Sequence, residues 1–413
     1  MKNESRTNKS IKNIVISVIG EISTIIVAFV ARTYFIRLLG AEYLGINGLF
    51  LSIVAFLSVA ELGFGAAITF SLYKPLAEKD ETKVKALMQL FRKVYTIIGL
   101  IIIALGIAFL PFLHFFTKDV SGIGNLYIYF ILILMTTAIS YFFSYKRTLI
   151  IADQKAYIVE TYKYIIFVIY NIIQIVLLIL WQNFYLFLIA HFIAIFVNNL
   201  MINYKANKMF PFLKDRKKVK LPKEETKILK KNIRAMFYQS IGAKLHTTLK
   251  NPIISAMVSI IILGVYTNYQ LITDTLIKLI TIMFTAITAS IGNLGATSDN
   301  IKSEKIFRNI FFGNFWLMAF CTTMLFTLLT PFITLWAGTD YLLDNYVVLA
   351  IIFNFYILGM RKSVIQFKTA LGLFWYDRYK PVLEAVTNLI LMVLLGYYYG
   401  LVGIFIGNIL SIL

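Results

Sequence analysis

Basic side chains inside long apolar segments are the residues of this sequence best suited to chemistry. Lys250 stands about 15 residues past the start of the helix expected at 235–263, which is about 22 Å along that helix. His246 lies four positions earlier and shares its helix face, and Arg361 lies deep in another segment. Lys and Arg bind phosphate oxygens, Arg through two parallel hydrogen bonds. These residue types therefore indicate capture of an anionic ligand.

The apolar segments contain more positive than negative side chains. The eight basic residues are Arg32, Arg37, Lys244, Lys250, Lys278, Arg361, Lys362 and Lys368, and the four acidic residues are Glu21, Glu61, Asp274 and Glu384. An interior with this excess attracts anions, whereas a cavity for cationic drugs would need the opposite sign. We therefore take Lys250, Arg361, Arg32, Lys244, His246 and Arg37 as candidate substrate-binding residues.

Other interpretations of these charges stay open at this point. Lys250 could pair with a carboxylate of a neighbouring helix, and Arg32 and Arg37 could be anchors at the membrane interface. Asp274 and Lys278 are four residues apart and could form an ion pair within one helix. Glu61, Glu384 and Asp274 are candidates for ion or proton coupling, although they could equally be counter-ions of the basic residues.

The elements that position these residues are transmembrane helices. The sequence is 59% hydrophobic and 15% charged, with a mean hydropathy of +0.79, which excludes an ordinary soluble domain. The apolar blocks are continuous and lack the period-two alternation of a transmembrane barrel. We expect an all-α integral membrane protein with no cleavable signal peptide.

The apolar blocks predict about twelve transmembrane helices. Their expected ranges are 14–39, 47–73, 94–116, 125–146, 164–181, 184–204, 235–263, 266–292, 309–335, 343–370, 381–398 and 401–413. The last block holds only about 13 residues, too few to cross about 30 Å of hydrocarbon. We therefore expect the native chain to continue beyond residue 413.

The basic residues outside these helices define the topology. The N-terminal segment and alternate loops contain 31 of the 40 Lys and Arg residues, and only Lys118 falls in an outer turn. The positive-inside rule then places the N-terminus in the cytoplasm and accounts for the net charge of +20 without nucleic acid. Residues 205–234 contain twelve Lys or Arg residues. We expect this segment to be a cytoplasmic connector between an N-lobe, 1–204, and a C-lobe, 235–413.

The two halves contain similar sequences. LLGAEYLGINGLFLSI in the first half matches IILGVYTNYQLITD in the second through Leu-Gly and Tyr. Ala-Ile-Thr-x-Ser occurs in both GAAITFSLYKPLAEKD and TAITASIGNLGATSDN, followed by an Asp at the same distance. Both copies run from inside to outside, so the repeat is parallel, with its axis along the membrane normal. Two such six-helix lobes are typical of a transporter that works by alternating access.

Features of an enzyme are missing from the sequence. We find no Walker A motif and no glycine-rich phosphate loop, and the three His and one Cys lack metal-ligand spacing. We therefore expect no catalytic residues, no cofactor and no metal. A membrane-embedded polymerase or glycosyltransferase remains the alternative of another class, although the short outer loops disfavour it.

One region also resembles a known family. ARTYFIRLLGAEYLGINGLF and the following SVAELGFGAAITFSLYKPLAEKD resemble the oligosaccharide-lipid flippases of bacterial polysaccharide biosynthesis, which belong to the superfamily of multidrug/oligosaccharidyl-lipid/polysaccharide exporters. The resemblance is most specific in residues 31–80 and extends to helix number and the basic connector. Family members usually continue past the position of residue 413.

The resemblance implies two V-shaped six-helix lobes in a bacterial plasma membrane. It implies a flippase of undecaprenyl-diphosphate-linked oligosaccharide repeat units, in which the diphosphate binds cationic residues and the polyprenyl tail stays in lipid. Membrane lipids and polysaccharide assembly proteins are the other candidate partners. Alternatives with the same fold are a flippase of the peptidoglycan precursor and a multidrug or cation antiporter.

Overall fold

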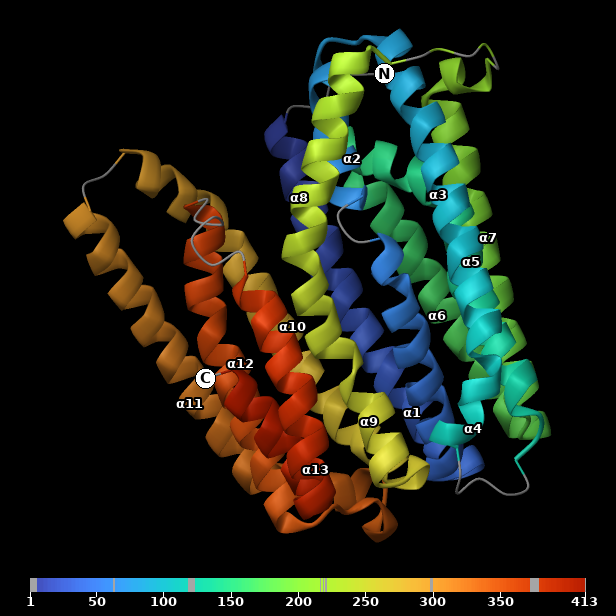
Figure 1. Cartoon of the computed structure of the whole chain (residues 1–413), viewed down its shortest axis with the longest axis vertical. Coiled ribbons are helices and arrows are strands. Elements are labelled where there is room, and N and C mark those ends of the chain that lie inside the picture. The colour runs from blue at the N-terminus through green and yellow to red at the C-terminus, as the bar shows by residue number, and fades with distance from the viewer. Residues whose placement is uncertain are drawn as a thin grey trace. The chain divides into compact units, whose positions relative to one another are not determined.

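The computed structural model describes residues 6–61, 64–117, 123–215, 217, 219, 221–297, 300–371 and 379–412. Within these ranges all regular structure is helical (Figure 1). The helices are α1 (Arg6–Leu57), α2 (Phe64–Ala77), α3 (Glu81–Phe109), α4 (Leu113–Phe116), α5 (Leu126–Ala152), α6 (Ala156–Trp181), α7 (Phe184–Met209), α8 (Lys223–Thr248), α9 (Lys250–Met257), α10 (Ile260–Thr297), α11 (Asn300–Trp336), α12 (Asn345–Ala370) and α13 (Lys380–Ile412). Four 3₁₀ turns are η1 (Ser58–Glu61), η2 (Leu110–Phe112), η3 (Pro211–Lys214) and η4 (Thr339–Tyr341). Nine of the described helical segments are long and apolar enough to cross a membrane, as expected of a multi-pass integral membrane protein.

Two glycines divide the longest helices into separate spans. The backbone of α1 passes through Gly40 at φ 83°, and that of α13 passes through Gly400 at φ 57°. Positive φ values are accessible to glycine and costly for residues with a side chain. Each glycine therefore ends one span and starts the next, as predicted for the turns near 40–46 and 398–400. α2 continues the span that begins after Gly40, and α9 continues the span that begins in α8. Counted this way, the described residues form the twelve predicted spans.

The predicted outer turn at 263–268 is wrong. The chain turns at Val258 and Ser259, and α10 begins at Ile260. The hydroxyl of Ser259 accepts a hydrogen bond from the backbone N–H of Ile261 at 3.1 Å, which caps the new helix. Gly264 therefore lies inside α10, where its small size serves close packing and not chain reversal.

Several helices begin earlier than hydropathy predicts. α3 begins at Glu81 and not near residue 94, because Asp80 caps it by accepting a hydrogen bond from the N–H of Lys83 at 2.9 Å. Hydropathy marks only the part of a helix that lies in hydrocarbon, so polar helical ends are missed. Lys118, the basic residue assigned to an outer turn, lies outside the described residues.

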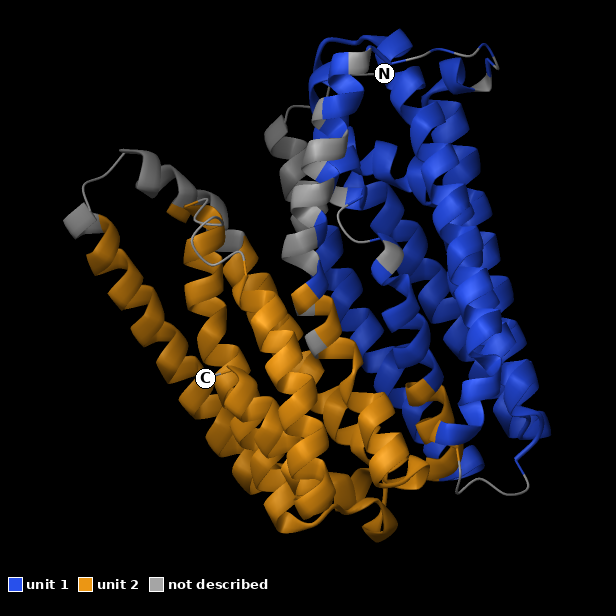
Figure 2. Ribbon diagram, viewed as in Figure 1, with its two compact units in different colours: residues 1–40, 50–115, 120–241 blue, residues 41–49, 116–119, 242–413 orange. Residues whose placement is uncertain are grey.

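The chain forms two compact units (Figure 2). Unit 1 contains residues 1–40, 50–115 and 120–241, and unit 2 contains residues 41–49, 116–119 and 242–413. The main boundary therefore falls inside α8, beyond the predicted end of the connector at residue 234. Most of the basic connector belongs with unit 1, because its residues are bonded to side chains of α3.

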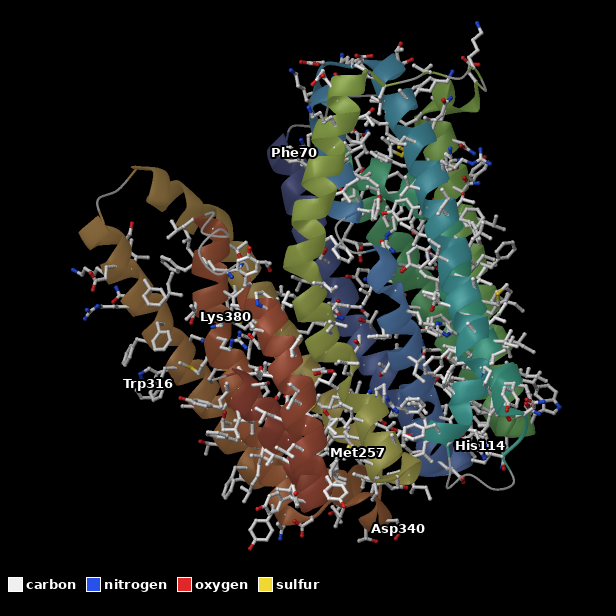
Figure 3. The ribbon with its side chains drawn as sticks, viewed as in Figure 1. Phe70, His114, Met257, Trp316, Asp340 and Lys380 are labelled. Carbon is white, nitrogen blue, oxygen red and sulfur yellow. The ribbon has the colours of Figure 1, made fainter. Side chains whose placement is uncertain are left out.

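In unit 1, α5 packs between α3 and α7. Phe130 of α5 lies edge-on to Phe50 with ring centroids 5.3 Å apart, and Tyr129 contacts Phe184 of α7 at 4.8 Å. Such aromatic pairs hold helices together in lipid, where apolar burial gives little driving force. Phe70 and His114 lie toward opposite ends of this unit (Figure 3).

In unit 2, α12 contacts α10, α11 and α13, and α9 packs against α10 and α13. A Cβ on Gly242 would lie 2.1 Å from the carbonyl oxygen of Pro381, and Met257 lies against Gly396. The two contacts have the same residue spacing, so the chain from Gly242 to Met257 runs parallel to the first half of α13. Lys380, at the start of α13, lies far from Met257 and Asp340 at the other end of the unit (Figure 3).

A close crossing within unit 2 relates the two halves of the sequence. A Cβ on Gly45 would lie 1.9 Å from the carbonyl oxygen of Ile260, and one on Gly264 would lie 1.8 Å from that of Ala41. Only glycine allows the backbones this approach. Ala41 and Ile260 each stand first in their helices, so each helix places its first residue against the fifth residue of the other.

The register of the crossing gives the register of the repeat. Leu44-Gly45 corresponds to Leu263-Gly264, a separation of 219 residues, and Gly48 then meets Thr267, its own counterpart. The same separation aligns the two Ala-Ile-Thr-x-Ser sequences at 67–71 and 286–290. This approximate two-fold symmetry supports the parallel repeat. It also shows that the second Leu-Gly pair of LLGAEYLG, and not the first, is the counterpart of Leu263-Gly264.

Candidate functional site

Lys250 begins α9 directly after a break in the seventh span. α8 ends at Thr248, and Pro252 has no N–H to donate to the Thr248 carbonyl. The Thr248 hydroxyl donates to the carbonyl of Lys244 at 2.9 Å. The kink predicted beside Lys250 is therefore confirmed, and it places a basic side chain at an irregular point of a transmembrane span.

The Lys250 ammonium lies in a cluster of side chains from α9, α10 and α13. Its Nζ atom is 5.3 Å from the ring centroid of Phe405, a cation–π contact, and it interacts electrostatically with Asp274. Gln270 interacts with the Asp274 side chain, and Asn251 donates to the Gln270 side-chain oxygen at 3.5 Å. The structure thus brings together a predicted substrate-binding residue, Lys250, and a predicted coupling residue, Asp274.

Arg361 of α12 forms an ion pair with Glu384 of α13. Its Nη1 and Nη2 atoms donate to the two carboxylate oxygens at 2.6 and 2.9 Å. The side chains are 25% and 13% exposed, so water reaches the pair only partly. Bidentate, charge-assisted pairs of this kind are among the stronger hydrogen bonds in proteins. A second predicted cation therefore has a predicted coupling residue as its partner.

The packing of residues 242–257 against α13 gives the relative depth of Lys250 and of the Arg361–Glu384 pair. The register set by Gly242 and Pro381 places Glu384 level with residue 245, next to Lys244. Lys250 lies five residues further along, or about 7 Å at 1.5 Å per residue. Lys244 is half-buried, and the side chain of His246 lies outside the described residues.

A chain of buried asparagines crosses α12 and α13. The amide of Asn354 donates to Asn408, and Asn408 donates to Asn388 at 3.0 Å. All three side chains are buried, and the Asn388 amide nitrogen has no hydrogen-bond partner among the described residues. Sequence reasoning missed this network because it considered charged residues only. Asparagine at several positions of apolar spans was the available signal, since polar groups in lipid need partners.

Glu61, at the end of η1 in unit 1, lies among hydroxyl groups. Tyr141 of α5 is within hydrogen-bonding reach of Glu61 and Ser58, and Tyr95 of α3 interacts electrostatically with Glu61. Tyr95 and Tyr141 stack with ring centroids 6.4 Å apart. The sequence pointed to the carboxylate but not to the two tyrosines, which come from different helices.

Arg32 and Arg37 lie on α1 at different depths. Arg37 is exposed and stands about 4 Å below the turn at Gly40, whereas half-buried Arg32 stands about 12 Å below it. Arg37 therefore has the position of an interfacial anchor, while Arg32 is too deep to reach the surface easily. A role of either residue in substrate binding stays a prediction.

The acids reduce the positive excess that the sequence suggested. Lys250 has Asp274 beside it, and Arg361 has Glu384, so a bound anion must share or displace a carboxylate at each position. The ion pair predicted between Asp274 and Lys278 stays a prediction. Within the described ranges, no group of three His, Cys, Asp or Glu side chains could hold a metal ion.

Comparisons with known proteins identify the fold. Neither protein-family models nor curated proteins give a match to this sequence. Among solved structures, the lipid II flippase MurJ in an inward closed conformation aligns with a TM-score of 0.69 and 15% identity, over 97% of this chain and 86% of that one. An inward-facing MATE family multidrug resistance transporter gives 0.64 and 16%, over 94% and 92%.

A third structure comes from Pyrococcus furiosus, a MOP superfamily transporter with reversed polarity of its binding pocket. It aligns with a TM-score of 0.62 and 14% identity, over 99% of this chain and 94% of that one. Identities this low show the fold and leave the substrate open. The chain is therefore an all-helical, multi-pass membrane protein with the fold of the MOP superfamily transporters.

Proposed function

We propose that the protein is a flippase that moves undecaprenyl-diphosphate-linked oligosaccharide units across the plasma membrane by alternating access. The observation that carries the proposal is the pair of intramembrane cation sites in unit 2, built on Lys250 and Arg361 and only about 7 Å apart in depth. A diphosphate carries two phosphate groups, and more than one cationic side chain is needed to balance its charge. The resemblance of residues 31–80 to oligosaccharide-lipid flippases supports the same class of cargo.

The carboxylate partners fit a binding site that is empty for part of its cycle. An unpaired cation inside a span is costly, so Asp274 and Glu384 stabilise Lys250 and Arg361 while no anion is bound. The Arg361 fork, which binds a carboxylate with two hydrogen bonds, can bind a phosphate group in the same geometry. Asp274 is exposed in the middle of a span, and we infer that it faces water because lipid would penalise its charge.

Release of these carboxylates offers a route to coupling. When cargo takes over the cations, Asp274 or Glu384 loses its counter-ion and becomes ready to bind a proton or another cation. Glu61, with Tyr141 beside it, is a second candidate in unit 1. An ion or proton gradient would then drive the return of the empty carrier. Transport that is indifferent to both gradients would remove coupling from the proposal.

A flippase of the peptidoglycan precursor is the second candidate, favoured by the alignment with the lipid II flippase. That cargo also has a polyprenyl diphosphate, so the cationic sites suit both. A multidrug antiporter, suggested by the MATE alignment, requires a site that attracts cations. Only the two carboxylates, once freed of Lys250 and Arg361, would provide one.

The test is a flipping assay in proteoliposomes with three cargoes. These are a polyprenyl-diphosphate oligosaccharide, the peptidoglycan precursor and a cationic dye. We expect the first to be transported, and Lys250→Ala to abolish its transport, while the exposed cytoplasmic Lys208→Ala serves as the matched control and leaves it unchanged. Preference for the precursor would select the second candidate. Transport of the dye alone, or full activity of Lys250→Ala, would contradict the proposal.

A further inference from the structure

A cavity at the cytoplasmic end of unit 1 is lined by none of the candidate residues for cargo binding or coupling. Its volume is about 1060 Å³, and most of its charged and polar lining comes from α3 and α5, with Asp215 of the connector and Thr226 of α8 completing it. The principal lining side chains are Lys85, Gln89, Arg92, Lys93, Tyr145 and Lys146. The apolar lining comes from α3 and from the basic connector, which contributes Leu213, Val219 and Leu221.

The connector is fastened over this cavity by specific contacts with α3. Gln89 donates to the carbonyl of Lys217 at 2.8 Å and accepts from the N–H of Val219 at 3.1 Å. Lys85, which is buried, forms an ion pair of 2.6 Å with Asp215. The hydrogen bond from Lys85 holds the pKa of Asp215 below its ordinary value. These contacts make the connector a wall of the cavity instead of a solvated loop.

A third contact fastens the connector where α8 begins. Lys83 Nζ lies 2.6 Å from a carboxylate oxygen of Glu225. Together with the contacts of Lys85 and Gln89, it explains why the basic connector belongs to unit 1. Two lysines of α3 are neutralised by these acids, so the positive charge that remains in the cavity comes from other side chains.

That remaining charge belongs to Arg92, Lys93 and Lys146. Lys146 donates to the side-chain oxygens of Asn203 and of Asn207, at 2.7 Å for the latter, so its ammonium is held in position by neutral groups. Arg92 is close enough to act electrostatically on Lys146. Among the residues that the structure describes, no carboxylate forms an ion pair with these three cations. Like charges fixed near each other repel, and a bound anion would offset that repulsion.

The cavity has the features of a lipid headgroup site. We propose that it binds the phosphate-bearing headgroup of an anionic phospholipid of the inner leaflet, with Arg92 and Lys146 as the phosphate ligands. The mixture of cationic and apolar lining residues suits a headgroup attached to acyl chains, and the volume far exceeds that of a phosphate ion. Basic pockets between helices on the cytoplasmic side of a membrane commonly bind such lipids. The proposal is independent of the cargo in unit 2.

Native mass spectrometry of the full chain tests the proposal. The protein is released from phosphatidylcholine nanodiscs that contain phosphatidylglycerol, and retained lipids are counted. We expect one phosphatidylglycerol to be retained by the wild type and by Lys208→Gln, whose exposed lysine lies outside the cavity. The double variant Arg92→Gln/Lys146→Gln should bind it at least about tenfold more weakly, the loss of two phosphate contacts. Equal retention by this variant would overturn the proposal.

Two further measurements distinguish lost charge from misfolding, and a lipid from a soluble phosphate. Arg92→Lys/Lys146→Arg keeps both charges and should keep the lipid. If Arg92→Gln/Lys146→Gln melts at the same temperature as the wild type, misfolding is excluded as the cause of its weaker lipid binding. Inorganic phosphate and diphosphate are added as competitors. If either binds in the cavity while phosphatidylglycerol does not, the ligand is a soluble phosphate and the lipid proposal fails.

Discussion

The basic residues inside unit 2 and those at the cytoplasmic end of unit 1 have different partners. In unit 2, Arg361 forms a bidentate pair with Glu384, and Lys250 lies beside Asp274. In unit 1, Lys146 is held by asparagine amides and faces Arg92. The difference follows from depth. A cation within hydrocarbon needs a carboxylate of the protein whenever no ligand is bound, whereas a cation at the interface can be left for an anion from the membrane or solution.

Breaking the pair in unit 2 should have the largest effect. Arg361→Ala leaves the Glu384 carboxylate without its partner, and loss of one member of a buried pair costs about 3–5 kcal/mol, which partial exposure reduces here to about 2 kcal/mol. We expect a clearly lower midpoint of thermal denaturation, followed by tryptophan fluorescence in detergent. The double variant Arg361→Ala/Glu384→Ala should recover part of the loss.

The chain offers a matched control for this experiment. Arg308 binds Glu304 through Nε at 3.0 Å and Nη2 at 2.7 Å, yet its side chain is 76% exposed. Arg308→Ala should therefore change stability by less than about 1 kcal/mol. Equal losses for Arg308→Ala and Arg361→Ala would show that depth does not distinguish the two pairs.

Raising the salt concentration should affect lipid binding in unit 1 more than stability in unit 2, and the effect should be smaller than that of the substitutions above. Arg92 and Lys93 of the unit 1 cavity are exposed, and raising the ionic strength from about 0.05 M to about 0.5 M shortens the screening length to about 4 Å. We expect phosphatidylglycerol binding to weaken about fivefold over this range, measured by native mass spectrometry after equilibration in each buffer. The loss of melting temperature caused by Arg361→Ala should hardly change over the same range of ionic strength. A lipid affinity insensitive to salt would contradict the role of Arg92.

The smallest effect should come from the connector contact. Because the pKa of Asp215 lies below its ordinary value of 3.8, the contribution of its ion pair is complete above that pH and is lost as pH falls through the lowered pKa. Amide protection of residues 211–221, measured by hydrogen exchange and corrected for intrinsic rates, should stay constant from about pH 8 to about pH 5. Asp215→Asn should lower protection about two- to threefold and remove the acid step.

Hydropathy and charge predicted the parts of the fold that depend on one segment at a time. The twelve spans and the turns at Gly40 and Gly400 follow from apolar length and from glycine's access to positive φ. The break beside Lys250 follows from Pro252. The turn at Val258 and Ser259 could not be predicted in this way, since it falls within a continuous apolar run and is fixed by a serine cap.

The partners of the candidate residues could not be predicted from the sequence, because they come from different helices. Glu384 is close to Arg361 through the packing of α12 against α13, and Tyr141 reaches Glu61 from α5. A single sequence gives the charge of each residue but not which neighbour compensates it. The connector was predicted as a polar loop, and only its contacts with Gln89 and Lys85 reveal it as a wall of a cavity.

The two-fold crossing at Gly45 and Gly264 bears on the origin of the chain. Each helix gives the other the same contact that it receives, and Gly48 stands opposite Thr267, the residue at its own position in the other copy. Two identical six-helix proteins would associate through this crossing without any change of geometry. Gene duplication and fusion of such a homodimer would yield this crossing, which now has glycine at position 48 and threonine at position 267.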